Sequence, residues 1–133
     1  MKIDHLGIAV RDLKSANELF ARLLGEPHYK IEEVASEKVA TSFFRAGDSK
    51  IELLEATDPN SPIAKFMERR GEGIHHIAFE VEDIMAEMQR LENQGFTPLS
   101  REPKRGADNK LVLFFHPKTT GGVLIELCQS LPE

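Results

Sequence analysis

The chain has 133 residues, a formal net charge of −5, 41% hydrophobic residues and 29% charged residues, which predicts a single globular domain over residues 1–133. The acidic balance argues against a nucleic-acid partner. No apolar run approaches the roughly 20 residues of a membrane span, and the chain begins directly with strand pattern rather than a signal peptide. Cys128 is the only cysteine. No disulfide can therefore form within the chain, and we expect a cytoplasmic location.

The first half of the chain predicts the element order βαβββ. Asp12 is expected to begin a helix as its N-cap, and Gly25 to end it, with apolar residues recurring at helical spacing between them. Alternating and β-branched stretches on either side of this helix are typical of strands. The expected strands are residues 3–10, 29–34, 38–45 and 50–55.

Residues 57–72 are expected to connect this half to the next. Ser61 suits a helix cap and Pro62 suits the first helical position, so a short helix is predicted up to Arg70. Residues 73–81 (Gly-Ile-His-His-Ile-Ala-Phe-Glu-Val) then predict a buried strand that carries an imidazole.

The second half repeats the first. His5 and His76 are 71 positions apart (76 − 5), and so are the predicted helix caps Asp12 and Asp83 (83 − 12). Glu52 and Glu126 are 74 apart (126 − 52), which places three extra residues in the second hairpin loop, where insertions are tolerated. The sequence therefore predicts an α+β fold of two tandem βαβββ modules, module 1 over about residues 1–56 and module 2 over about residues 73–133.

The residues at the duplicated positions are the candidate metal ligands. Each module has one His on its first strand and one Glu on its last strand, and each Glu is flanked by Ile and Leu. A carboxylate in that setting is expected to be buried, which is costly unless something compensates its charge. His5, Glu52, His76 and Glu126 would together form an N2O2 site for a divalent ion such as Mn, Co, Ni, Zn or Fe(II).

A competing interpretation is structural. Histidines on apolar strands are more often core residues bonded to the backbone, and a Glu between Ile and Leu more often lies on the exposed side of a strand. Four such residues at duplicate-equivalent positions favour the metal site. His28, His75 and His116 have no His at the equivalent position, and we do not expect them to be ligands.

The doubled βαβββ plan, with ligands on the first and last strand of each module, resembles the vicinal oxygen chelate (glyoxalase) superfamily. Within it, four stretches are similar to the methylmalonyl-CoA epimerase family, and the likeness covers essentially the whole chain. They are DHLGIAV (4–10), KIELLEATDPNSPIAKF (50–66), GEGIHHIAFEV (71–81) and HPKTTGGVLIELCQ (116–129).

This resemblance implies a curled mixed sheet around a metal site, with His5, Glu52, His76 and Glu126 as metal ligands. It implies epimerisation of (R)- and (S)-methylmalonyl-CoA through a metal-stabilised enolate, with Glu126 as a base as well as a ligand. Some epimerases carry a second Glu where this chain has Thr41, so Glu37, Lys38 or a water would have to replace that base. The resemblance also implies a homodimer.

Coenzyme A is anionic, so a local positive patch is needed on this acidic chain. We expect Lys118 to contact the phosphates of coenzyme A, as one of a group of basic residues predicted in loops around the last two strands. A solvated loop of mixed charge, with no role in binding, would explain this group of basic residues equally well. The group comprises Arg101, Lys104, Arg105, Lys110 and Lys118.

Three alternatives within the superfamily stay open. A glyoxalase I-type lactoylglutathione lyase would use a similar His/Glu ligand set. An extradiol dioxygenase would use two His and one Glu around Fe(II), and Glu52 as a fourth ligand counts against it. A non-catalytic binding protein would lack the metal quartet.

Overall fold

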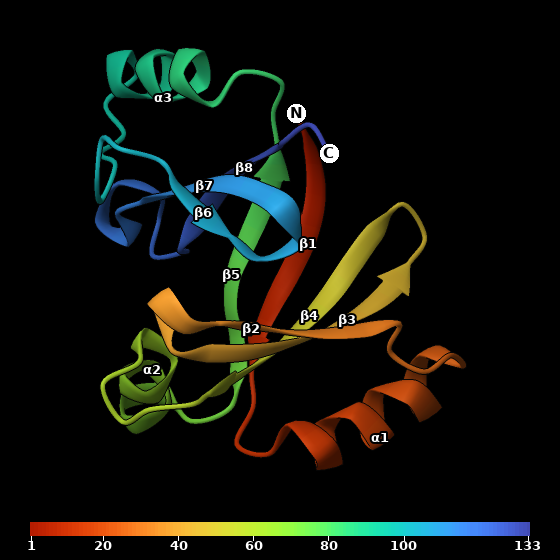
Figure 1. Ribbon diagram of the computed structural model, residues 1–133. Coiled ribbons are helices and arrows are strands. Elements are labelled where there is room, and N and C mark those ends of the chain that lie inside the picture. Colours follow the sequence, from red (N-terminus) through yellow and green to blue (C-terminus); the bar gives the residue numbers. More distant parts are fainter. The chain divides into compact units, whose positions relative to one another are not determined.

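The computed structural model describes residues 1–133 as two compact units, one of His5–His75 and the other of Met1–Asp4 together with His76–Glu133. The eight strands follow the order β2-β3-β4-β1-β5-β8-β7-β6 in a mixed sheet. None of the three helices is long and apolar enough to cross a membrane. The predicted α+β fold of two βαβββ modules is confirmed (Figure 1).

Module 1 contains one helix and four strands. Helix α1 spans Leu13–Leu24. Strand β1 pairs with β4 in parallel, whereas β3 pairs antiparallel with both β2 and β4. The strands are β1 (Lys2–Ala9), β2 (Lys30–Val34), β3 (Val39–Ala46) and β4 (Ser49–Ala56). Helix α2 (Pro62–Arg70) follows, capped by Ser61 as predicted.

Module 2 repeats this arrangement with a shorter edge strand. Helix α3 spans Ile84–Asn93. Strand β5 pairs with β8 in parallel, and β7 pairs antiparallel with β8 and β6. The strands are β5 (Gly73–Glu80), β6 (Lys104–Gly106), β7 (Lys110–Phe115) and β8 (Ile125–Ser130). Short 3₁₀ turns occupy Ala35–Glu37, Ala107–Asn109 and Pro117–Thr119.

The duplication extends to the bonds that begin the helices. Asp12 accepts a hydrogen bond from the Ser15 N–H, and Asp83 accepts one from the Ala86 N–H. The last strand of each module also supplies an acceptor. The Glu55 carboxylate accepts from the Leu13 N–H at 2.6 Å, and the Gln129 amide oxygen accepts from the Ile84 N–H at 2.9 Å. These acceptors satisfy N–H groups that a helix cannot satisfy by itself.

Each module covers one face of its strands with its own helix. In module 1, Ala16 of α1 packs with Phe44 and Leu53. In module 2, Ile84 and Met88 of α3 pack with Leu127 and other apolar strand residues. Because side chains alternate along a strand, residues 52 and 126 lie on the faces that α1 and α3 leave uncovered.

Candidate metal centre

The first His–Glu pair lies in the unit His5–His75. Strands β1 and β4 run parallel, and Glu52 is in register with Gly7, two residues beyond His5 on the same face. The His5 Nδ1 atom is 3.1 Å from Glu52 Oε2. Both residues are only 5% exposed. This module therefore brings an imidazole and a carboxylate together away from bulk solvent.

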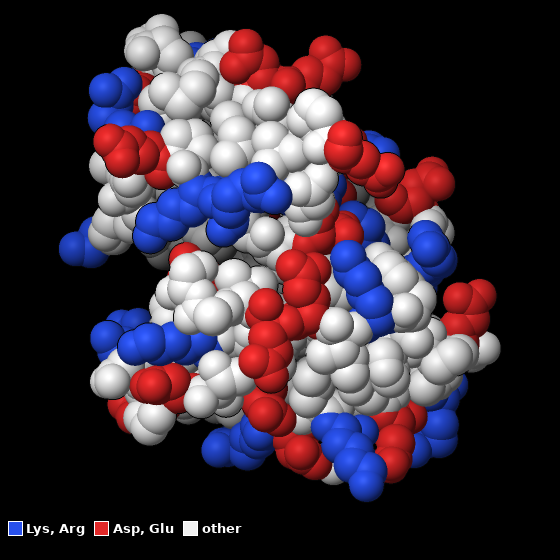
Figure 2. Space-filling view, viewed as in Figure 1, with Lys and Arg blue, Asp and Glu red and all other residues white.

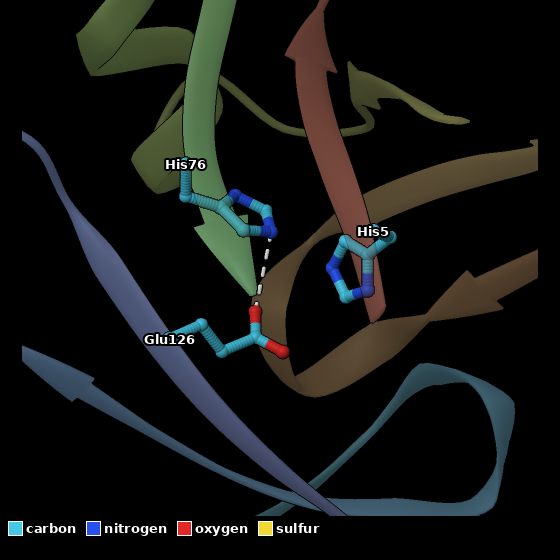
Figure 3. A group of neighbouring side chains, drawn as sticks. All are labelled: His5, His76 and Glu126. Atoms are coloured by element: carbon cyan, nitrogen blue, oxygen red, sulfur yellow. Dashed lines mark ion pairs between the residues drawn. The ribbon is translucent and has the colours of Figure 1, made fainter. Parts of the chain in front are cut away.

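The second pair lies in the other unit and has the same construction. Glu126 of β8 is in register with Ala78, again two residues beyond the His of the first strand. His76 Nε2 is 3.2 Å from Glu126 Oε1, and the two side chains reach toward each other from neighbouring strands (Figure 3). Phe114, in register with Glu126 on β7, packs edge-on against the His76 ring at 5.7 Å.

The donor atoms of each pair suit a metal ion. Bonds of about 2.0–2.2 Å from one ion to an imidazole nitrogen and a carboxylate oxygen place those two atoms about 2.8–3.1 Å apart at a 90° angle and about 3.3–3.5 Å apart at a tetrahedral angle. The separations of 3.1 Å and 3.2 Å lie between these two geometries. All four residues are buried, and a buried carboxylate needs a compensating charge. Two groups of three donors could each hold an ion: His5, His76 and Glu126 form one, and Asp4, His5 and Glu52 form the other, with the donor atoms of each group within 4.8 Å of one another.

The remaining histidines have other neighbours. His75 packs edge-on against Phe66 of α2 at 4.9 Å, and His28 packs edge-on against Phe44 at 5.9 Å. His116 precedes the turn Pro117–Thr119, and its Nδ1 atom accepts the Lys118 N–H. Each of these imidazoles therefore has a structural role of its own.

Thr41 lies on the same face of its sheet as Glu52. It is 1% exposed and in register with Leu54 of β4, two residues from Glu52. Glu37 belongs to the 3₁₀ turn ahead of β3, and Lys38 follows it with a left-handed backbone (φ 55°). The strand register thus leaves a threonine, rather than Glu37 or Lys38, beside Glu52.

Some of the basic residues predicted to contact coenzyme A are exposed, but Lys110 is not. Lys and Arg gather over β6, where Lys104 and Arg105 are exposed (Figure 2). Lys118 is exposed in its turn. The prediction that Lys104, Arg105 and Lys110 lie in loops is wrong, because the first two belong to β6 and Lys110 is the first residue of β7. Lys110 is 5% exposed, because its ammonium pairs with Asp4 and Glu80 inside the fold.

Sequence reasoning missed Asp4 and Lys110 as buried charged residues. Asp4 is 4% exposed even though it alternates with His5 along β1. Strand alternation predicts one buried face, so the burial of two consecutive polar residues had no local signal. A buried carboxylate is also a possible metal donor, and Asp4 is a candidate in that sense.

Comparison with known proteins agrees with this architecture. Residues 4–114 match the Glyoxalase/Bleomycin resistance protein/Dioxygenase superfamily. The chain is 42% identical to an ethylmalonyl-CoA/methylmalonyl-CoA epimerase of Cereibacter sphaeroides, covering 96% of this chain and 97% of that one.

Solved structures give the same result. The methylmalonyl-CoA epimerase of Mycobacterium tuberculosis is 36% identical with a TM-score of 0.93, covering 98% of this chain and 89% of that one. A Streptomyces coelicolor methylmalonyl-CoA epimerase variant in complex with 2-nitronate-propionyl-CoA is 34% identical with a TM-score of 0.93, covering 98% and 94%. The chain therefore belongs to the Glyoxalase/Bleomycin resistance protein/Dioxygenase superfamily, and the resemblance to its methylmalonyl-CoA epimerases is confirmed.

Proposed function

We propose that this chain epimerises methylmalonyl-CoA at C2. The observation that carries the proposal is the presence of two buried His–Glu pairs in the same register of two repeated modules. The relatives support the choice of substrate, since they are epimerases of that thioester and one was solved with a CoA-linked analogue.

The proposed ligands of one divalent ion are His5, Glu52, His76 and Glu126. Two imidazoles and two carboxylates suit Co, Mn, Ni or Zn without choosing among them. Asp4 is a less suitable ligand because its Oδ1 atom already lies 3.3 Å from the Lys110 ammonium. A divalent ion at this site would supply Lewis-acid stabilisation of negative charge on the substrate oxygens.

The proposed base is Glu126. The proton at C2 lies between a thioester and a carboxylate, so its removal gives an enolate, and a carboxylate within reach can take it. Burial of Glu126 beside Phe114 keeps its oxygens out of bulk water. The low-dielectric setting strengthens the interaction of its charge with nearby cations and polar groups.

The proton that returns to C2 must reach the opposite face. A threonine hydroxyl is not a base at neutral pH, so Thr41 does not provide the second carboxylate base that the resemblance implies. We assign the returned proton to water, and the hydroxide that this leaves is neutralised through solvent by the proton that Glu126 releases. Solvent hydrogen then enters the product at C2, which provides a direct assay.

Lys118 is the proposed contact for the coenzyme A phosphates. Its exposed ammonium follows the His116 turn, where the hydrogen bond from the Lys118 N–H to His116 fixes the backbone. The exposed Lys104 and Arg105 of β6 are further candidates. Such contacts would be charge-assisted hydrogen bonds that salt weakens.

The proposed assembly is a homodimer in the cytoplasm. Module 1 leaves three large apolar side chains exposed, Leu19 and Leu23 of α1 and Ile31 of β2, and a second copy could cover them. The single cysteine, Cys128, is buried and free, as is usual in a reducing compartment. Light scattering on the purified protein gives the assembly mass directly.

The test of the function is hydrogen exchange. Purified protein with methylmalonyl-CoA in deuterated water should place deuterium at C2, measured by mass spectrometry. The same protein with methylglyoxal and glutathione should give no lactoylglutathione, which separates the epimerase from a glyoxalase. Absence of exchange in the presence of added Co or Mn would refute the proposal.

A further inference from the structure

Lys110 is a buried cation that the proposed reaction does not use. Its side chain is 7% exposed, and its Nζ atom lies 3.3 Å from Asp4 Oδ1, 3.3 Å from Glu80 Oε2 and 3.1 Å from Ser130 Oγ. Lys2 adds a looser contact to Glu80 at 3.9 Å. One ammonium on β7 thus bonds to side chains from three other strands.

Those three strands also carry proposed metal ligands. Asp4 immediately precedes His5 on β1, Glu80 ends the strand of His76, and Ser130 ends the strand of Glu126. The shortest path runs through Asp4, where one peptide unit separates the residue held by Lys110 from His5. Lys110 therefore holds β1 in place at the residue just before His5, the first proposed metal ligand in the chain.

Module 1 has apolar side chains at the positions equivalent to Lys110, Glu80 and Ser130, whereas the equivalent of Asp4 is His75 (75 − 4 = 71), which packs edge-on against Phe66. Residue 39 corresponds to residue 110 (110 − 39 = 71). Both are the first residues of their strands, and each is in register with the last residue of the following strand. The equivalent pairs are Val39 and Lys110, Ala9 and Glu80, Leu54 and Cys128, and Ala56 and Ser130.

In module 1 these residues form an apolar cluster. Ala9, Val39 and Leu54 pack together with Ile63 of α2, and Ala56 packs against them. The chain itself thus shows that this strand geometry accepts an apolar filling. In module 2 the same positions hold an ammonium, a carboxylate and a hydroxyl, and a second carboxylate, that of Asp4, also contacts the ammonium.

Stability alone does not account for such a replacement. Burying a charged network costs desolvation, and well-packed apolar residues of similar volume are often as stabilising or more so. What a charged network adds is a defined arrangement of its partners, because an ammonium with three fixed acceptors tolerates few alternatives. The charged network around Lys110 is therefore better explained by its holding its partner residues in a defined arrangement than by its contribution to stability.

We propose that Lys110 is a positioning residue that acts through Asp4 to hold His5 for metal binding. This inference rests on the proposed function, since it takes His5 to be a metal ligand. Residues that orient metal ligands from the next layer typically change metal affinity about 10- to 100-fold when removed.

The test measures Co²⁺ binding by calorimetry and visible absorption. The main variant combines Asp4→Asn with Lys110→Met, because Lys110→Met alone would leave the buried Asp4 charge without its cation. We expect the Co²⁺ Kd to rise about tenfold or more. Lys65→Met, at an exposed lysine of α2, is the matched control and should bind as the wild type does.

A double-mutant cycle in the His5→Ala background tests whether Lys110 affects Co²⁺ binding through His5. If Lys110 acts through His5, adding Asp4→Asn and Lys110→Met to His5→Ala should change the Kd less than twofold, since the residue being positioned is already absent. A double variant that binds Co²⁺ as tightly as the wild type, even with a lower unfolding midpoint, would overturn the inference and leave the epimerase intact. Failure of the wild type to bind Co²⁺ would overturn the metal site and this inference together.

Discussion

Replacing Glu126 with Gln tests the base with little change to the fold. The side chain is 5% exposed and lies 3.2 Å from His76 Nε2. Gln has the same shape and still offers an oxygen there, so the stability change should stay within the roughly 0.5–1.5 kcal/mol of one hydrogen bond. That is small beside a typical folding stability of about 5–15 kcal/mol. The variant should therefore be folded.

The chemical effect should be far larger. A positioned base contributes about 10²–10⁴ in rate, which corresponds to about 2.7–5.4 kcal/mol of barrier. Deuterium incorporation at C2 of methylmalonyl-CoA should fall by that factor in Glu126→Gln. Glu82→Gln, at an exposed glutamate after β5, is the matched control and should exchange normally. Wild-type exchange rates in Glu126→Gln would remove Glu126 from the mechanism.

Three further predictions concern the metal, the thiol and the helix caps. Dialysis against a chelator should abolish exchange and added Co or Mn should restore it; activity that survives chelation with no metal detected would contradict the quartet. Burial raises the pKa of the Cys128 thiol, with the Asp4 carboxylate adding to the effect. The native protein should thus resist alkylation of Cys128 at pH 8, and rapid labelling of the native protein would contradict this. Its unfolding free energy should fall above about pH 8.5, because there the thiol ionises only in the unfolded state. Glu55→Ala leaves the Leu13 N–H without its acceptor and should cost about 1–3 kcal/mol in urea unfolding, whereas an unchanged midpoint would show that water replaces the carboxylate.

The two-module plan could be predicted because its signals are local. Asp12 and Asp83 cap helices through bonds to residues three positions later. Gly25 ends α1 with a left-handed backbone (φ 79°), which costs glycine little. A repeat spacing of 71 then carried each assignment from one half of the chain to the other. The grouping of His5, Glu52, His76 and Glu126 followed from their equivalent positions in the two modules, without any knowledge of strand order.

The charged residues show where local reasoning ends. Lys110 and Lys118 are both lysines near the last hairpin, and nothing in their immediate sequence separates them. One is buried in ion pairs and the other is exposed, because β7 places Lys110 against the start of β1, 106 positions away in the sequence.

The sequence by itself determined the secondary structure, the internal duplication and the four proposed ligands, since each depends on residue type at short range or on a fixed repeat. Only the tertiary structure decided the 3.1 Å and 3.2 Å separations within the His–Glu pairs, the threonine beside Glu52, and the burial of Asp4 and Lys110. Those features depend on which strands pair and in what register. Pairing is a long-range choice made by the packing of the whole chain, and no short stretch of residues encodes it.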